Sequence, residues 1–182
     1  VLKRRFLHDG GYHLVRTKSL EEFPDSCGSL SAVVLYFHHC EVSDASLEKL
    51  RMFVFGGGGL LAVHSATASF KEQPEYARLL GGSFAGHGPV SEFECMPEAG
   101  GEVFTGLPRF SVRDELYLHE FEPGIRVHYT SFYEGEKVPV VWTRTYGQGR
   151  VCAAVPGHTL STLRNSVYQQ VLLRGLAWVG ES

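Results

Sequence analysis

Residues 56–65 read Gly-Gly-Gly-Gly-Leu-Leu-Ala-Val-His-Ser, and this stretch decides the expected fold. The apolar run Leu60–Val63 has no polar alternation and stops at His64, a pattern that predicts a strand buried on both faces in a parallel sheet. The four glycines before it allow a tight, close-packed lead into that strand. Because ligands collect at the carboxyl ends of such strands, we expect His64 to lie at a binding rim.

The residues on either side alternate between strand and helix patterns. A nearly continuous apolar run over 32–37 predicts a strand, and Ser43 is a suitable N-cap for a helix over 44–55. After the Leu60–Val63 strand, a short helix is expected over 75–80. This order of elements is the signature of a right-handed parallel α/β sheet.

A second short apolar run, Arg150–Val155, ends in Pro-Gly-His158, much as the first run ends in His64. We expect the two to be parallel inner strands that are neighbours or near-neighbours, so that both histidines reach one rim of the sheet. Ser161 then begins a long final helix with a broad apolar stripe.

The length of 182 residues suits a single domain, spanning residues 1–182, with a substantial core. Residues 83–146 differ from the rest, because Pro and Gly recur there and the strands alternate between apolar and polar side chains. They predict a β-rich lobe within that domain.

The composition limits the kinds of partner and the location that we expect for this protein. Lys and Arg number 17 against 20 Asp and Glu, a formal net charge of −3, and this balance argues against nucleic acid as a partner. No apolar run approaches the roughly 18 residues that a membrane span needs. The four cysteines lie far apart and fit neither a zinc ribbon nor a disulfide framework, so a reducing, cytoplasmic location is expected.

Three histidines are candidates for chemistry. His64 and His158 each follow an apolar strand, and His87 lies in a glycine-flanked loop beyond the helix that follows His64. We expect the three imidazoles to converge, where they can bind a divalent metal such as zinc or relay protons, since an unperturbed His titrates at about 6.5. Asp114 and Glu115 are the carboxylates expected to act as acid and base or to bind hydroxyl groups.

Each of these histidines also has an ordinary structural explanation, because a single His at a strand end is more often a hydrogen-bonded structural residue. None of the spacings matches a short metal motif such as His-Glu-x-x-His. The metal-binding, acid–base and structural interpretations therefore stay open.

Three further side chains are candidates for binding a substrate. Trp142 can offer a stacking face to a sugar and Arg144 a hydrogen-bonding fork, in which case the indole should be partly exposed beside His64. Ser65 lies next to His64, although the Gly-x-Ser-x-Gly motif of a serine nucleophile is absent. The alternative for Trp142 and Arg144 is packing within a hairpin.

Several of these segments together resemble the ThuA-like (trehalose utilisation) family. In the family's order, the matching stretches are Phe53–Ser65, Tyr76–Phe84 with His87, Asp114–Tyr117, Pro139–Arg144, Tyr146–Val151 and Gly157-His158. The resemblance implies a class I glutamine amidotransferase-like fold, a flavodoxin-like three-layer α/β sandwich with a mostly parallel sheet and a β-rich insertion.

The resemblance also carries two departures. His64 stands where amidotransferases carry their catalytic Cys, so glutaminase chemistry is not expected, although His158 falls where their catalytic His would be. The chain also begins inside what would be the family's first helix, so the family's N-terminal strand is expected to be missing.

As to function, the resemblance implies use of trehalose or another disaccharide, through oxidised (keto) sugars. We expect a small-molecule sugar to bind at the rim made by His64, His87 and His158. The competing hypotheses are a non-catalytic sugar-binding or structural module and a metal-dependent hydrolase. Whether the protein is an enzyme and whether it forms a homo-oligomer are both left open by the sequence.

Overall fold

The computed structural model describes residues 4, 11–24, 28–99 and 102–181. Its strands are β1 Ala32–Leu35, β2 Gly59–Val63, β3 Gly82–His87, β4 Ser91–Pro97, β5 Phe110–Asp114, β6 Tyr117–Phe121, β7 Arg126–Tyr133, β8 Glu136–Tyr146 and β9 Gly149–Ala154. Its helices are α2 Asp44–Phe55, α3 Pro74–Leu80, α4 Leu160–Arg164 and α5 Ser166–Gly180, with the 3-10 helices η1 Leu20–Glu22 and η2 His64–Ala68. The helical residues expected at the start of the chain lie, apart from Arg4, outside the described part.

The main sheet has seven strands in the order β1-β2-β9-β8-β7-β4-β5. β1, β2 and β9 are parallel, and β2 pairs with β9 so that Leu60 lies opposite Val151 and Val63 opposite Ala154. Both strands are internal to the sheet, as the sequence predicted. Their carboxyl ends therefore meet at one rim.

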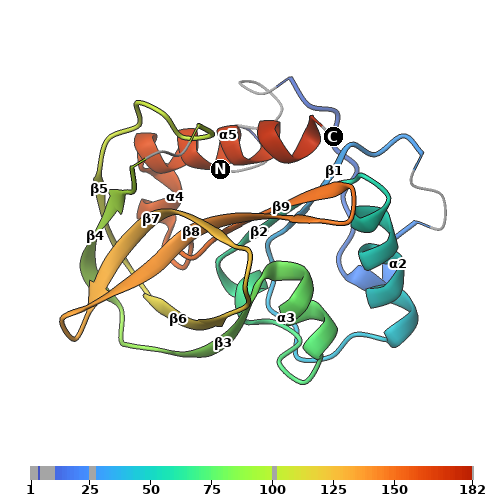
Figure 1. Cartoon of the computed structure of the whole chain (residues 1–182), viewed down its shortest axis with the longest axis horizontal. Helices are drawn as coiled ribbons and strands as arrows, with labels where there is room; N and C mark the ends of the chain where they lie inside the picture. The colour runs from blue at the N-terminus through green and yellow to red at the C-terminus, as the bar shows by residue number, and fades with distance from the viewer. Residues whose placement is uncertain (1–3, 5–10, 25–27, 100–101, 182) are drawn as a thin grey trace.

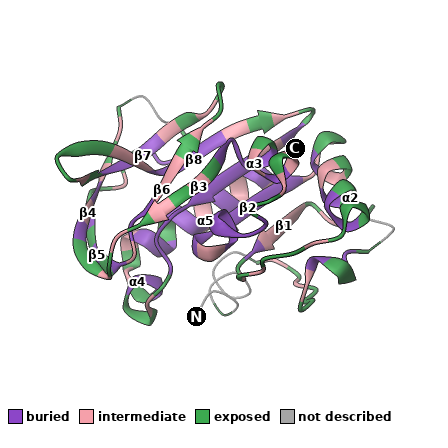
Figure 2. Ribbon diagram, turned by 90° about the horizontal axis from the view of Figure 1, so that it is seen from below, coloured by how far each residue is buried: buried purple, intermediate pink, exposed green. Residues whose placement is uncertain are grey.

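Strand β2 is buried on both faces because its side chains alternate between two cores. Leu61 and Val63 belong to the core that includes α5, whereas Leu60 and Ala62 belong to the core that includes α2 and α3. Figure 1 shows α5 on one side of these strands and α2 and α3 on the other. In Figure 2 the buried residues run along β2, while exposed residues gather on the outer surface of α2 and on α4.

The prediction of a mostly parallel sheet is wrong. β8, β7, β4 and β5 are all antiparallel to their neighbours. The physical reason is local: two-residue turns at Glu134-Gly135 and Gly147-Gln148 join β7 to β8 and β8 to β9, and so tight a turn can join only antiparallel strands. The protein is a mixed α/β fold with a curled, mostly antiparallel sheet, and a three-layer sandwich is not confirmed for the sheet as a whole.

Within residues 83–146 the structure contains strands and, in the described residues, no helix. β4, β5, β7 and β8 extend the main sheet, while β3 and β6 form a separate antiparallel pair.

The expected final helix is instead two helices, α4 and α5. Asn165 lies between them with extended backbone, and its side-chain oxygen accepts hydrogen bonds from the backbone N–H groups of Val167 and Tyr168. None of the helices in the described residues is long and apolar enough to cross a membrane.

The close approach of β9 to the end of α2 depends on Gly149. A Cβ atom added there would lie 2.0 Å from the carbonyl oxygen of Val54 and 2.3 Å from that of Gly58, and backbone atoms cannot easily move aside. We expect Gly149→Ala to lower the free energy of unfolding by about 1–3 kcal/mol, the usual cost of overpacking, as measured by denaturant titration. Gly86→Ala is the matched control, because nothing lies within 4 Å of its added Cβ, and equal losses in the two variants would contradict the explanation.

Candidate functional site

The carboxylate of Asp114, at the end of β5, holds the loop that follows β9. Asp114 is fully buried, and its Oδ1 accepts hydrogen bonds from the backbone N–H groups of Glu115, Gly157 and His158 at 3.0, 3.2 and 3.0 Å. Its Oδ2 accepts another from the N–H of Thr159 at 3.2 Å. Asp114 is thus a positioning residue for the loop, and its predicted acid–base or hydroxyl-binding role stays a prediction.

This contact reveals how strongly the sheet is curled. β5 lies four strands from β9, a separation of about 19 Å in a flat sheet at about 4.8 Å per strand. Asp114 nevertheless touches the loop directly after β9, and the hydroxyl of Thr159 donates to the carbonyl of Arg113 at 3.0 Å. Curling therefore brings the far edge of the sheet to the rim at the end of β2 and β9.

His64 begins η2 directly after β2 and is only 3% exposed. Its Nδ1 lies 2.9 Å from the carbonyl oxygen of Val155, which can only accept, so Nδ1 carries the proton. In the neutral ring Nε2 then holds a lone pair, and it lies 3.2 Å from the hydroxyl of Tyr117. Burial lowers the pKa of His64, so the neutral form is favoured.

The backbone at His64 is strained. Its φ of 51° falls in the left-handed region, which non-glycine residues adopt at a cost of about 1–2 kcal/mol. Gly157 approaches so closely that a Cβ on it would lie 2.6 Å from the Cβ of His64. The hydroxyl of Tyr36 donates to the Gly157 carbonyl at 2.8 Å and fixes the loop on its other side. Strain of this kind concentrates at functional sites.

Three side chains converge at this rim: His64, Glu115 and His158. One ligand-type atom from each lies within 4.8 Å of the others. Glu115 Oε2 is 3.8 Å from Nε2 of His64 and 3.2 Å from Nδ1 of His158. The side chain of His158 is 47% exposed and that of Glu115 17%, so the cluster opens to solvent beside His158.

His87 is not a member of this cluster. It ends β3 opposite Tyr117, is exposed, and its Nδ1 lies 2.8 Å from the Gly88 carbonyl oxygen. The Tyr117 ring contacts both histidines, with its centroid 4.5 Å from that of His64 and 5.3 Å from that of His87. His87 is therefore a neighbour of the cluster, while the third close ligand-type side chain beside His64 and His158 is Glu115.

Trp142 and Arg144 lie away from this site. Trp142 is 0% exposed and its indole N–H donates to the Leu80 carbonyl at 2.8 Å, so the expected partial exposure is wrong. Arg144 lies opposite Val151, well before the carboxyl end of β9, and its guanidinium donates to the Arg78 carbonyl at 2.6 Å. Through these hydrogen bonds both side chains hold the hairpin β8–β9 against the end of α3.

Ser65 stays close to the cluster, in η2 and partly buried, and its carbonyl accepts a hydrogen bond from the Ser69 hydroxyl at 2.9 Å. Tyr117 was not singled out from the sequence, although its signal was present. It lies two positions after Glu115, the spacing that places side chains on the same side of an extended segment.

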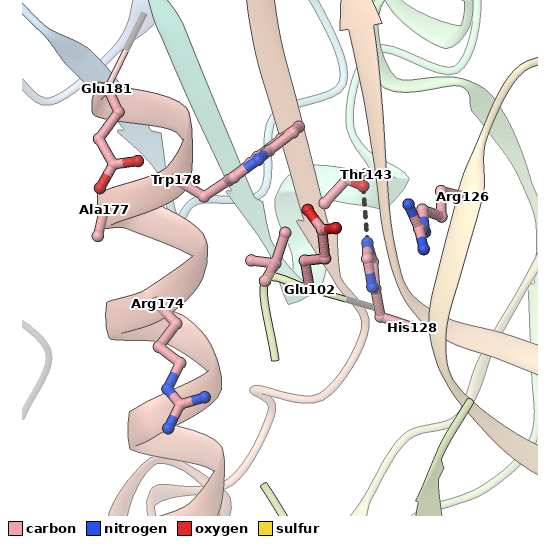
Figure 3. A pocket seen from close by; sticks show the side chains of 9 residues that line it. Glu102, Arg126, His128, Thr143, Arg174, Ala177, Trp178 and Glu181 are labelled. Atoms are coloured by element: carbon pink, nitrogen blue, oxygen red, sulfur yellow. Dashed lines mark hydrogen bonds between the residues drawn. The ribbon is translucent and has the colours of Figure 1, made fainter. Parts of the chain in front are cut away.

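His128 is a second residue that the sequence did not reveal. It is 2% exposed, its Nε2 lies 2.7 Å from the Thr143 hydroxyl, and its Nδ1 is buried without a hydrogen-bond partner in the described residues. It borders a cavity of about 400 Å³ between α5, β7 and β8, with Arg126, Arg174 and Trp178 around it (Figure 3). This cavity is separate from the His64 cluster.

The hydrogen bonds of Asp114 lead to a first prediction for this site. Asp114→Asn removes the negative charge and turns an N–H donor toward a backbone N–H, so we expect the free energy of unfolding to fall by about 1.5–3 kcal/mol. Glu94→Gln is the control, because in the described part of the chain this carboxylate pairs with exposed Arg109 and should contribute less than about 0.5 kcal/mol. A loss at Asp114 no larger than that of the control would contradict its role.

The buried histidines make stability depend on pH. Burial lowers the pKa of His119 and of His128 to about 4, against about 6.5 in the unfolded chain. Below about pH 6.5 these histidines bind protons in the unfolded chain but not in the folded protein, so acid favours unfolding. We expect the unfolding free energy to be lower at pH 5 than at pH 7. The decrease should be at most about 1.4 kcal/mol per pH unit for each histidine.

His128→Gln tests the assignment of this pH effect, since the amide can retain the contact with Thr143 but does not titrate. The slope of unfolding free energy against pH should be shallower in this variant. An unchanged slope would show that His128 is not responsible.

Known proteins share both the sequence pattern and the fold of this chain. The family model for ThuA, described as trehalose utilisation, matches residues 4–179. The ThuA-like protein of Parabacteroides merdae ATCC 43184 is 21% identical, with 98% of this chain and 82% of that chain covered and a TM-score of 0.81. The ThuA-like protein of Bacteroides uniformis ATCC 8492 is 16% identical, with 98% of this chain and 81% of that chain covered and a TM-score of 0.83.

STM1381, a cytoplasmic protein of Salmonella typhimurium LT2, is 16% identical, with 87% of this chain and 76% of that chain covered and a TM-score of 0.69. No curated protein matches the sequence. At these identities the solved structures share the fold alone, whereas the family match extends over nearly the whole chain. The chain belongs to the ThuA (trehalose utilisation) family.

Proposed function

We propose that this protein serves the utilisation of trehalose or another disaccharide, in its ordinary or its oxidised (keto) form, and that it binds the sugar at the rim formed by His64, Glu115 and His158. The single observation behind this proposal is the convergence of the three side chains at an opening to solvent. Membership of the trehalose utilisation family supports the choice of a sugar.

The polar groups at the rim suit a ligand rich in hydroxyl groups. Glu115 can accept hydrogen bonds from two adjacent hydroxyls, and half-exposed His158 can donate or accept. The Glu115–His158 contact of 3.2 Å also forms a pair that can move a proton to or from a bound sugar. Neutral, buried His64 closes the inner end of the site.

Thiol chemistry of the amidotransferase kind is not part of the proposal. The position of the catalytic Cys in amidotransferases carries His64. Cys152 is fully buried, and burial raises the pKa of its thiol to about 12. Cys95 is also buried, and burial raises its pKa as well.

We propose the cytoplasm as the place of action. The fold neighbour STM1381 is described as a cytoplasmic protein, and the widely spaced cysteines suit a reducing compartment. A non-catalytic sugar-binding module is the competing function, and turnover of keto-disaccharides by the purified protein separates the two.

Sugar binding can be measured by calorimetric titration with trehalose and with its keto form. Removing a charge-assisted hydrogen bond costs about 1.5–3 kcal/mol, so Glu115→Gln and His158→Ala should each weaken binding at least about tenfold. Arg144→Ala is the control, because its guanidinium contacts the Arg78 carbonyl away from the rim, and it should bind as the wild type does. Full affinity in both rim variants would refute the site.

A further inference from the structure

We propose that His64 Nε2, Glu115 Oε2 and His158 Nδ1 bind one divalent transition-metal ion, with a zinc-like preference for nitrogen ligands. The inference adds a metal to the proposed sugar site. It rests on the proposed function only for the claim that a sugar binds next to the metal. The metal site itself can be tested without any sugar.

The distances fit a site that needs little movement to close. Zinc holds nitrogen and oxygen ligands at about 2.0–2.2 Å, so tetrahedral ligand atoms lie about 3.4 Å apart. Glu115 Oε2 is already 3.2 Å from His158 Nδ1 and 3.8 Å from His64 Nε2, and all three atoms lie within 4.8 Å. Because His158 is half exposed, its ring has room to turn toward the other two.

The surroundings of His64 are those of a metal ligand. Metal-bound histidines almost always donate their second ring N–H to a carbonyl or carboxylate, which fixes the tautomer and the ring orientation. Here the Val155 carbonyl accepts from Nδ1 at 2.9 Å and directs the Nε2 lone pair toward Glu115. The carboxylate of Asp114, 3.9 Å from Nδ1, adds negative charge that favours a cation.

Tyr117 is the group that has to move. Its hydroxyl lies 3.2 Å from Nε2 and also hydrogen-bonds with Glu115, so it would compete with an ion for the lone pair of His64. Rotation of the O–H and a small shift of the ring would leave Tyr117 hydrogen-bonded to Glu115 beside the ion. The tyrosine then acts as a positioning residue for the carboxylate ligand.

The ligand types narrow the choice of metal. Calcium and magnesium prefer oxygen ligands, whereas two imidazoles and one carboxylate suit zinc, cobalt, iron or manganese. Three protein ligands leave at least one coordination position open, as in catalytic rather than structural zinc sites. The opening beside His158 would present that position to a sugar hydroxyl or keto oxygen.

The experiment uses the full chain, stripped of metal by a chelator, and measures zinc affinity by competition with a chromophoric chelator. Cobalt serves as the spectroscopic probe, because its absorption reports nitrogen ligation directly. The wild type should bind one ion per chain. Glu115→Gln and His158→Ala should each weaken the affinity at least about tenfold, since even residues behind the ligands contribute about 10–100-fold.

His87→Ala is the matched control, because His87 is an exposed histidine beside Tyr117 that does not belong to the cluster. It should bind zinc with the wild-type affinity. Variants of His64 are not used, since a buried residue with a φ of 51° can fail to fold when replaced. Circular dichroism confirms that the other variants are folded.

The inference is overturned if the wild type binds no zinc at micromolar concentration, if either rim variant keeps the wild-type affinity, or if His87→Ala loses as much as they do. Its fate is separate from that of the proposed function. Specific zinc binding without sugar affinity, in the presence or absence of the metal, would refute the sugar site alone. Sugar binding that persists unchanged in chelator, together with no zinc binding, would refute the metal site alone.

Discussion

The buried carboxylate of Asp114 is the constraint on which the rim depends. It accepts four backbone hydrogen bonds, from Glu115, the residue directly after β5, and from the three successive residues 157–159 on the loop after β9. A charge removed from water is tolerated only when its oxygens are satisfied in this way. The interaction connects the edge strand β5 of a curled sheet to the loop after its parallel strand β9.

One consequence is the neighbouring carboxylate. Because Asp114 is fixed to the loop after β9, the next residue, Glu115, is brought between His64 and His158, which come from the ends of two other strands. Three segments distant in the chain thereby place their side chains together. Successive residues have different tasks: Asp114 holds the backbone, and Glu115 faces the ligand atoms.

His64 determines the chemistry that this rim can offer. It stands at a strained turn directly after a buried strand, with a φ of 51°. It presents an imidazole that is held in one tautomer by the Val155 carbonyl, and not a nucleophile. Polar binding, proton transfer and metal coordination all suit that arrangement.

By itself the sequence determined the local elements and the parallel pairing of β2 with β9. The helix over 44–55 with its Ser43 cap, and the parallel pair containing Leu60 and Val151, follow from apolar periodicity and capping residues, which act over a few positions. For the same reason the sequence correctly placed His64 and His158 at one rim.

Tertiary structure decided the rest. The curl of the sheet accumulates over several strands and has no signature in any one of them. That curl brings Glu115 to the rim. Burial is also a property of the whole fold. Trp142, an aromatic residue that suited a sugar face, is enclosed, and its indole N–H donates to the Leu80 carbonyl at the end of α3.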